Sequence, residues 1–404
     1  MKSKGRRYLE LVYHKVVILV FSAVGRLPKK NLFFFESFHG RQYSDNPRAI
    51  YEYLRENYPE IQCVWSVKKG FEQPLIDEKV PFVRRMGIKW LFLMPRAKYW
   101  VFNTRMPAWM KKTIGTIYVQ TWHGTPLKRL GLDIERVNMP ETDTNKYRKN
   151  FADESKRWDY LLSSNRYSTD IFRRAFDYKG EILEIGYPRN DVLQDIRKRN
   201  RNRKEILSSL NLSEKNRIIL YAPTWRDNQF HHKGSYKYEN HFPFSEILER
   251  DSEVIILLRT HYLVVDAISV NQYKGRVLDC SKYPDIRDLY LISDLLITDY
   301  SSVLFDYAYT KRPQLYYMYD KEEYDRNIRG FYFDPQEELP GLIVTKQAEV
   351  IEASLMLLSQ AKTGRVNPRY QSFYEKYCST SLVSASEQLI TKLLEKSDEG
   401  ENLV

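Results

Sequence analysis

The chain has 404 residues, of which 43% are hydrophobic and 14% aromatic, so it is long enough for two domains with substantial cores. Its three cysteines (Cys63, Cys280 and Cys378) are scattered and form no CxxC pair, which excludes a disulfide scaffold or a zinc ribbon and indicates a reducing compartment. The net charge of +12 favours anionic partners such as phosphorylated substrates, anionic lipid or nucleic acid.

The first 30 residues are strongly basic and partly apolar. Their longest uninterrupted apolar stretch, Val16–Val24, has nine residues, whereas a membrane-spanning helix needs about 20. We therefore predict that residues 1–30 form an amphipathic segment that lies on the cytoplasmic face of the cell membrane, as a peripheral (monotopic) anchor. The alternative is a helix that packs in the core of the first domain.

Short apolar segments rich in β-formers alternate with longer helical patterns through the rest of the chain. This alternation predicts an α/β fold with parallel sheets. The first series of predicted strands is 32–35, 61–67, 99–102, 116–120, 160–162 and 182–185. The second series is 218–221, 254–258, 276–278, 295–298, 314–318 and 342–344.

The charged segment QDIRKRNRNRKE separates the two series and is interpreted as a linker. We expect an N-terminal Rossmann-like domain over residues 31–195 and a C-terminal one over 205–395, with a cleft between them. The composition after Lys396 predicts a disordered tail.

Polar residues follow five of the predicted strands. Because ligands bind at the carboxyl ends of strands in open parallel sheets, these residues are expected to line the cleft. They lie at 120–125, 163–165, 222–227, 259–262 and 298–302.

His123 stands between Trp122 and Gly124 at one of these strand ends. Histidine accepts a proton near neutral pH, and glycine permits close approach of the backbone. Thr125 and Pro126 fit the first positions of a helix, whose free N–H groups would attract an anion. A histidine that only stabilises a turn explains the pattern equally well.

Three further strand ends suggest phosphate contacts. Ser301 and Ser302, after Asp299, suit the N-terminus of a helix, where they either cap it or bind phosphate. Arg259 and His261 suit a diphosphate, or an ion pair that holds a loop. Thr224 and Arg226 suit a ligand contact or a salt bridge between domains. No GxGxxG, P-loop, HExxH or D-x-D motif occurs, so no cofactor or metal is expected.

Taken in order, several segments resemble the CDP-glycerol glycerophosphotransferase family of teichoic acid synthesis. They are FESFHGRQYSDNPRAIYEYL (35–54), QTWHGTPLKRLG (120–131), GYPRND (186–191), ILYAPTWRDN (219–228), LLRTHY (257–262) and ISDLLITDYSSVLFDYA (292–308). The resemblance covers residues 32 to 364 and implies a GT-B fold of two Rossmann-like domains, with the acceptor bound by the N-terminal domain and CDP-glycerol, the donor, by the C-terminal one. It also implies transfer of glycerol phosphate from CDP-glycerol to a hydroxyl of an undecaprenyl-diphosphate-linked glycan acceptor, with release of CMP.

The resemblance assigns roles residue by residue. It makes His123 the catalytic base and Arg259 and His261 the donor-side pair, with His261 also a catalytic candidate. It assigns binding of the donor phosphates to Asp299, Ser301 and Ser302. The other substrate-binding candidates are Gly124, Thr125, Thr224 and Arg226. Because the first strand is predicted near Leu32, the chain resembles the shorter, primase-like members.

Other functions remain open at this stage. A polymerase for teichoic acid or capsule that uses CDP-glycerol or CDP-ribitol would share these motifs, and a nucleotide-sugar glycosyltransferase would share the fold. A nucleic-acid-binding protein is disfavoured because the basic segments lack interleaved aromatic residues. The sequence leaves open whether the chain forms a homo-oligomer.

Overall fold

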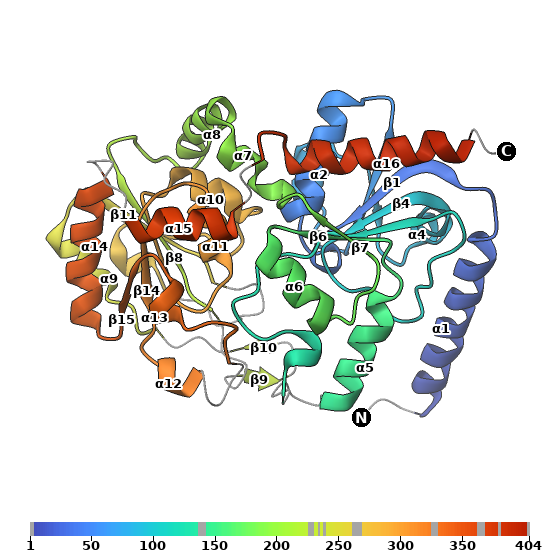
Figure 1. Ribbon diagram of the computed structural model, residues 1–404, viewed down its shortest axis with the longest axis horizontal. Helices are drawn as coiled ribbons and strands as arrows, with labels where there is room; N and C mark the ends of the chain where they lie inside the picture. Colours follow the sequence, from blue (N-terminus) through green and yellow to red (C-terminus); the bar gives the residue numbers. More distant parts are fainter. Residues whose placement is uncertain are drawn as a thin grey trace.

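The computed structural model describes residues 4–135, 143–224, 230–232, 235–236, 240–260, 269–324, 330–361, 368–378 and 381–401. Two parallel sheets form, one from each half of the chain, and helices cover their faces (Figure 1). Parallel neighbours need a crossover connection, which the intervening helices supply. The predicted α/β class with two parallel sheets is therefore observed.

The N-terminal sheet has the strand order β3-β2-β1-β4-β5-β6-β7. Its interior strand β1 is buried on both sides: Phe33 and Phe35 enter one core cluster and Phe34 enters the other. This double burial explains why the strand is apolar throughout rather than alternating. The strands are β1 Lys30–Glu36, β2 Gln62–Val67, β3 Phe82–Arg84, β4 Ala97–Phe102, β5 Ile117–Gln120, β6 Tyr160–Ser163 and β7 Glu181–Glu184.

The C-terminal sheet has the order β12-β11-β8-β13-β14-β15, and every residue of β11 and β13 is buried. Its strands are β8 Arg217–Ala222, β11 Val254–Leu258, β12 Val277–Asp279, β13 Leu295–Thr298, β14 Gln314–Tyr317 and β15 Leu342–Val344. Both ends of each predicted strand lie within two residues of the ends of an observed strand. The predictions missed β3 and the short antiparallel pair β9 Phe230–His232 and β10 Ser235–Tyr236, which are too brief to show a period.

Helices connect the strands and several are capped by side chains. The Asn165 side chain accepts a hydrogen bond from Ser168 N at the start of α6, for example. The α-helices are α1 Lys4–Val24, α2 Asp45–Asn57, α3 Gln73–Asp77, α4 Ile88–Leu93, α5 Thr144–Ser155, α6 Arg166–Ala175, α7 Asp191–Gln194, α8 Ile196–Ser209, α9 Phe244–Arg250, α10 Ile286–Ile292, α11 Val303–Ala308, α12 Lys321–Glu323, α13 Pro335–Glu338, α14 Gln347–Ala361, α15 Pro368–Tyr377 and α16 Ala385–Glu401. Short 3₁₀ turns are η1 Phe38–Gly40, η2 Met94–Arg96, η3 Gly131–Asp133, η4 Pro188–Asn190 and η5 Asn271–Tyr273.

Helix α1 has two apolar faces. Val17, Phe21 and Val24 are buried, and the Phe21 ring lies 5.7 Å from the rings of both Trp90 and Trp109. The other face exposes a second apolar stripe, Val12, Val16 and Leu19. Within the described residues, neither α1 nor any other helix combines the length and hydropathy needed to cross a bilayer.

The predicted linker is a helix. Asp195 caps α8, and the buried residues Ile206 and Leu207 pack in the core of the C-terminal domain. Arg203 donates hydrogen bonds to the carbonyls of Leu291 and Ile292, so this basic segment is bound to α10. Of the arginines that suggested a linker, Arg197 and Arg201 are exposed on the outer surface of this docked helix, whereas Arg199 and Arg203 are half-buried.

The C-terminal helix α16 returns to the N-terminal domain, although its residues fall mostly within the range expected for the C-terminal one. Leu389, Ile390 and Leu393 are buried in the core cluster of the first sheet, and in Figure 1 α16 lies beside α2. The backbone of α16 stays helical to Glu401, where the composition predicted disorder. Apolar residues at helical spacing, and a sheet face to cover, explain this docking.

Candidate active site

A cavity of about 330 Å³ lies between the two domains. Both domains line it, and it brings together seven of the predicted site residues. They are His123, Gly124 and Thr125 from the N-terminal domain, and Thr224, Arg259, Ser301 and Ser302 from the C-terminal one. Predicted residues Arg226 and His261 lie outside the described residues.

The His123 ring is held by one hydrogen bond. Its Nδ1 lies 2.7 Å from the backbone oxygen of Asn103. Because a carbonyl oxygen only accepts, Nδ1 carries a proton, so in the neutral ring Nε2 keeps its lone pair, which no residue described by the structure engages. Burial lowers the pKa of His123, although the bond to Asn103 and the Asp45 carboxylate act in the other direction. His123 is therefore neutral at pH 7 and ready to accept a proton.

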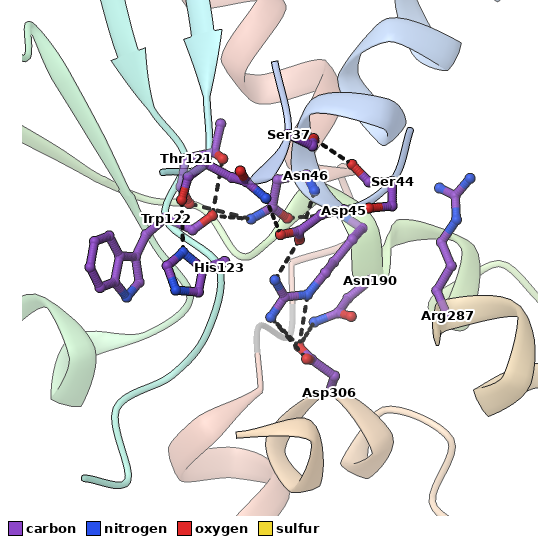
Figure 2. Close-up of polar contacts among 12 residues, drawn as sticks. Ser37, Ser44, Asp45, Asn46, Thr121, Trp122, His123, Asn190, Arg287 and Asp306 are labelled. Atoms are coloured by element: carbon purple, nitrogen blue, oxygen red, sulfur yellow. Dashed lines mark hydrogen bonds and ion pairs between the residues drawn. The ribbon is translucent and has the colours of Figure 1, made fainter. Parts of the chain in front are cut away.

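The turn before His123 is strained and is secured from α2. Trp122 has φ 53°, a left-handed value that costs a bulky residue energy, and its ring stacks on the imidazole at 4.5 Å. Asn46 Nδ2 donates to the carbonyls of Thr121 and Trp122, at 3.3 and 3.1 Å. Figure 2 shows these bonds converging on the turn.

Asp45 links His123 to the domain interface. Its Oδ2 accepts from the side chain of Asn103 at 2.6 Å, and its Oδ1 accepts from Arg189 Nη1 at 2.6 Å (Figure 2). Arg189 Nη2 in turn contacts Asp306 of α11 at 2.8 Å. One buried arginine thus joins the start of α2 to the C-terminal domain.

The sequence reasoning assigned no role to Asp45, Asn46 or Arg189. Their only signal was membership in the segments FESFHGRQYSDNPRAIYEYL and GYPRND, on which the family resemblance rests.

Gly124 touches the opposite domain. A Cβ at this position would lie 2.6 Å from Ser302 Oγ and 3.1 Å from Ser302 Cβ, so a side chain fits only if the Ser302 hydroxyl rotates and the two segments move slightly apart. The glycine thus allows this close contact across the cleft.

The helix predicted after Thr125 does not form. Thr125 Oγ1 is hydrogen-bonded to Ser164 Oγ at 2.8 Å instead of capping a helix. The backbone beyond it pairs with the other domain: Tyr332 N donates to Leu127 O, and Arg129 N donates to Gly330 O. Lys128 and Phe331 form an antiparallel bridge between these bonds. The backbone groups that a helix would need are therefore engaged by this ladder across the cleft.

The segment before α11 follows its prediction only in part. Ser302 occupies the N-cap position but makes no capping side-chain hydrogen bond, and both serines face the cavity. Asp299 lies behind the cavity wall, where its Oδ1 accepts from the backbone N of Thr224 and of Tyr300. Asp299 therefore shapes the two loops that line the cavity.

Arg259 holds a loop through backbone carbonyls. Its Nη1 lies 2.5 to 2.9 Å from the oxygens of Cys280, Ser281 and Tyr283. The sequence had suggested a carboxylate as the loop-holding partner. These bonds fix the guanidinium at the cavity wall, where a positive charge suits a phosphate.

Comparison with known proteins identifies the family. The model of the CDP-Glycerol:Poly(glycerophosphate) glycerophosphotransferase family matches residues 18–395. A teichoic acid poly(glycerol phosphate) polymerase of Bacillus subtilis (strain 168) is 47% identical over 92% of this chain, but this chain spans only 50% of that protein. A teichoic acid glycerol-phosphate transferase of Staphylococcus aureus (strain NCTC 8325 / PS 47) is 46% identical over 94% of this chain and 97% of its own length.

A teichoic acid glycerol-phosphate primase of Bacillus spizizenii (strain ATCC 23059 / NRRL B-14472 / W23) is less similar, with 33% identity over 69% of this chain. The primase-like expectation is thus not supported. The solved structure of the wall teichoic acid polymerase TagF, H548A, has a TM-score of 0.84 and 39% identity, and covers 98% of this chain and 97% of its own. This match confirms the predicted GT-B type of fold, and the chain belongs to the CDP-glycerol:poly(glycerophosphate) glycerophosphotransferase family.

Proposed function

We propose that this protein transfers glycerol phosphate from CDP-glycerol to a hydroxyl of a lipid-linked acceptor and releases CMP. The observation that carries the proposal is His123, a neutral histidine with a free Nε2 in the cavity between the domains. Membership in the family supplies the donor, CDP-glycerol.

In the proposed reaction His123 Nε2 takes the proton of the acceptor hydroxyl. The hydroxyl oxygen forms a bond to the phosphorus that carries glycerol, and the bond from that phosphorus to the CMP oxygen breaks. CMP leaves with the electron pair of the broken bond. Arg259 and the hydroxyls of Ser301 and Ser302 lie where they would stabilise the charge of the leaving group, and His261 and Arg226 remain predicted contributors.

We propose further that the protein extends a glycerol phosphate chain rather than adding its first unit. Greater similarity to a polymerase and to a glycerol-phosphate transferase than to a primase supports this choice. CDP-ribitol as donor, and a nucleotide sugar as donor, are the competing possibilities.

The proposed site of action is the cytoplasmic surface of the cell membrane. Two sets of exposed apolar residues support this location: the stripe of α1, and Ile88 and Phe92 of the neighbouring α4. Lys15 and Lys89 are exposed beside them. An apolar surface flanked by lysines suits an anionic bilayer. One face of α1 would remain in the protein core while the other enters the lipid.

The donor and acceptor can be tested together by product mass. The protein is incubated with CDP-glycerol, CDP-ribitol or a UDP-sugar, and with a synthetic lipid-linked disaccharide carrying either no glycerol phosphate or one. We expect added glycerol phosphate units from CDP-glycerol on the acceptor that already carries one. Products only from CDP-ribitol or the UDP-sugar would overturn the donor, and a single addition confined to the bare disaccharide would restore the primase interpretation.

The role of His123 is tested in the same assay. His123→Gln is expected to lower kcat by roughly 10²- to 10⁴-fold, the usual contribution of a general base. His241→Gln is the matched control, because His241 does not line the cavity between the domains. Full activity of His123→Gln would remove this residue as the base.

A further inference from the structure

A second and larger cavity adjoins the cavity between the domains. It has a volume of about 960 Å³ and lies wholly within the N-terminal domain, against α5 and the loop after β4. Both cavities are lined by Trp122, His123 and Leu130. A base that deprotonates one substrate for attack on another must lie where the two substrates meet. His123, which lines both cavities, is at such a position.

The polar lining of this second cavity is mainly cationic. Three of its basic residues already have carboxylate partners: Lys112 pairs with Asp159 at 2.6 Å, Lys156 with Asp153 at 3.4 Å and Arg157 with Glu154 at 3.4 Å. These pairs neutralise much of the charge that the lining carries.

Arg105 and Lys111 differ from the other cations of the lining. Among the ion pairs of the described residues, neither has a carboxylate partner. The Arg105 guanidinium lies 4.0 Å from the ring centroid of Phe151 and 5.3 Å from that of Tyr147, so its plane is oriented by aromatic rings. An oriented guanidinium without a carboxylate suits a phosphate, which it binds through two parallel hydrogen bonds.

A strained turn forms another part of the wall. Phe38, His39 and Gly40 have φ values of 47°, 58° and 75°, and His39 lines the cavity. Left-handed values at two successive residues other than glycine are costly, and such strain is typical of functional sites. Phe38 N donates to the side chain of Asn103, and the backbone oxygen of the same residue holds His123. Asn103 therefore supports both the cavity wall and the proposed base.

We propose that this second cavity is the acceptor site, and that Arg105 and Lys111 bind an anionic phosphate group of the acceptor near the hydroxyl to be extended. The proposal rests on the proposed function. The bound phosphate belongs either to a glycerol phosphate unit already on the acceptor or to the diphosphate of the lipid carrier. In both cases donor and acceptor enter from separate cavities and meet at His123.

Steady-state kinetics with the full-length protein test this assignment. At saturating CDP-glycerol, Arg105→Gln and Lys111→Gln are each expected to raise the acceptor KM about 10- to 100-fold, the range for loss of a charge-assisted hydrogen bond. The KM for CDP-glycerol is expected to stay within about twofold of its original value, because neither residue lines the cavity between the domains. Arg166→Gln, which removes an exposed arginine paired with Asp170, is the control for charge and should change neither KM.

Two acceptors and one soluble probe distinguish the phosphate sources. A lipid-linked disaccharide without glycerol phosphate offers only the diphosphate, a second acceptor adds one glycerol phosphate, and a soluble glycerol phosphate trimer lacks the diphosphate. Calorimetric binding of the trimer, lost in Arg105→Gln, assigns the site to glycerol phosphate. A raised KM for the acceptor that carries one glycerol phosphate, without trimer binding by the original protein, assigns it to the diphosphate.

Unchanged acceptor KM values in both variants, with CDP-glycerol still consumed, would overturn the acceptor site and leave the proposed function intact. If the original protein does not consume CDP-glycerol, the proposed function fails instead. The trimer then still tests the cavity, because undiminished binding by Arg105→Gln, or no binding by the original protein, would overturn its assignment to glycerol phosphate. Melting temperatures of all variants confirm that the fold is retained.

Discussion

At the scale of single residues, His123 is defined by what its two ring nitrogens contact. Nδ1 donates to Asn103, so the proton-accepting nitrogen is fixed before any substrate binds. A turn histidine without this bond could rotate and present either nitrogen. The hydrogen bond fits both interpretations that the sequence left open, a base and a turn histidine bonded to backbone, and the His123→Gln assay distinguishes them.

The pH dependence of the reaction follows from the environment of His123. Burial lowers its pKa below the ordinary 6.5, and Arg189 and Arg105 act in the same direction while Asp45 opposes them. As the proposed base, His123 would act in its neutral form, so kcat/KM should rise with pH and level off above a pKa lower than 6.5. CMP release measured from pH 4.5 to 9 checks this expectation. An acidic limb centred above pH 7 would contradict it.

Asn46 offers a test of how the catalytic turn is positioned. Asn46→Ala removes the amide that donates to the carbonyls of Thr121 and Trp122, and only the Trp122 carbonyl keeps a second donor, the Thr121 hydroxyl. We therefore expect kcat to fall about 10-fold or more while the KM for CDP-glycerol changes little. Asn46→Asp should be equally damaging, because a carboxylate cannot donate to a carbonyl. An active Asn46→Asp variant would show that the side chain only fills space.

At the scale of elements, the segment after β5 packs closely against the N-cap of α11, where Gly124 contacts Ser302. Gly124→Ala should push the segments apart, since its Cβ would lie 2.6 Å from Ser302 Oγ. We expect a raised KM for CDP-glycerol and a lower melting temperature. Ser302→Ala removes the clashing oxygen, so the double variant should melt above Gly124→Ala alone. Additive losses in this double-mutant cycle would argue against the contact.

Helix α1 carries the prediction for membrane attachment. Replacing Val16 and Leu19, which are 50% and 69% exposed, by glutamate should abolish sedimentation with anionic vesicles. The fold should survive, because the buried face of α1 is untouched. Replacing the exposed Leu382 and Val383 by glutamate is the matched control and should leave sedimentation intact. Continued binding of the α1 variant would place the anchor elsewhere.

At the scale of the whole molecule, buried charges join the domains. Arg189, itself buried, contacts Asp45 on one side and Asp306 on the other. Arg189→Met should lower the free energy of unfolding by about 3–5 kcal/mol, because it leaves two buried carboxylates without their cation. Lys198 and Glu56 form an exposed pair between the domains, and Lys198→Met should cost less than about 1 kcal/mol. Denaturant titration measures both, and similar losses would show that burial does not matter here.

How far the sequence predicts this molecule depends on how local each signal is. The central strands were found because burial on both faces makes them apolar over several consecutive residues. The helix after Thr125 was predicted wrongly because the partners of its backbone, Gly330 and Tyr332, lie some 200 residues away along the chain. Asp45 and Arg189 escaped notice for the same reason, since their contacts are set by how the domains meet.

The return of α16 to the first sheet means that the chain passes between the domains twice. The first passage runs through α7, and the second lies between α15 and α16. Asp191 fastens them together, because its carboxylate accepts from the backbone of Ala385 and Ser386. Two joined connections leave mainly one freedom of movement, a rotation about the axis through them. Any opening between the domains is then expected to be a rotation about this axis, and it would break the bridge between Lys128 and Phe331.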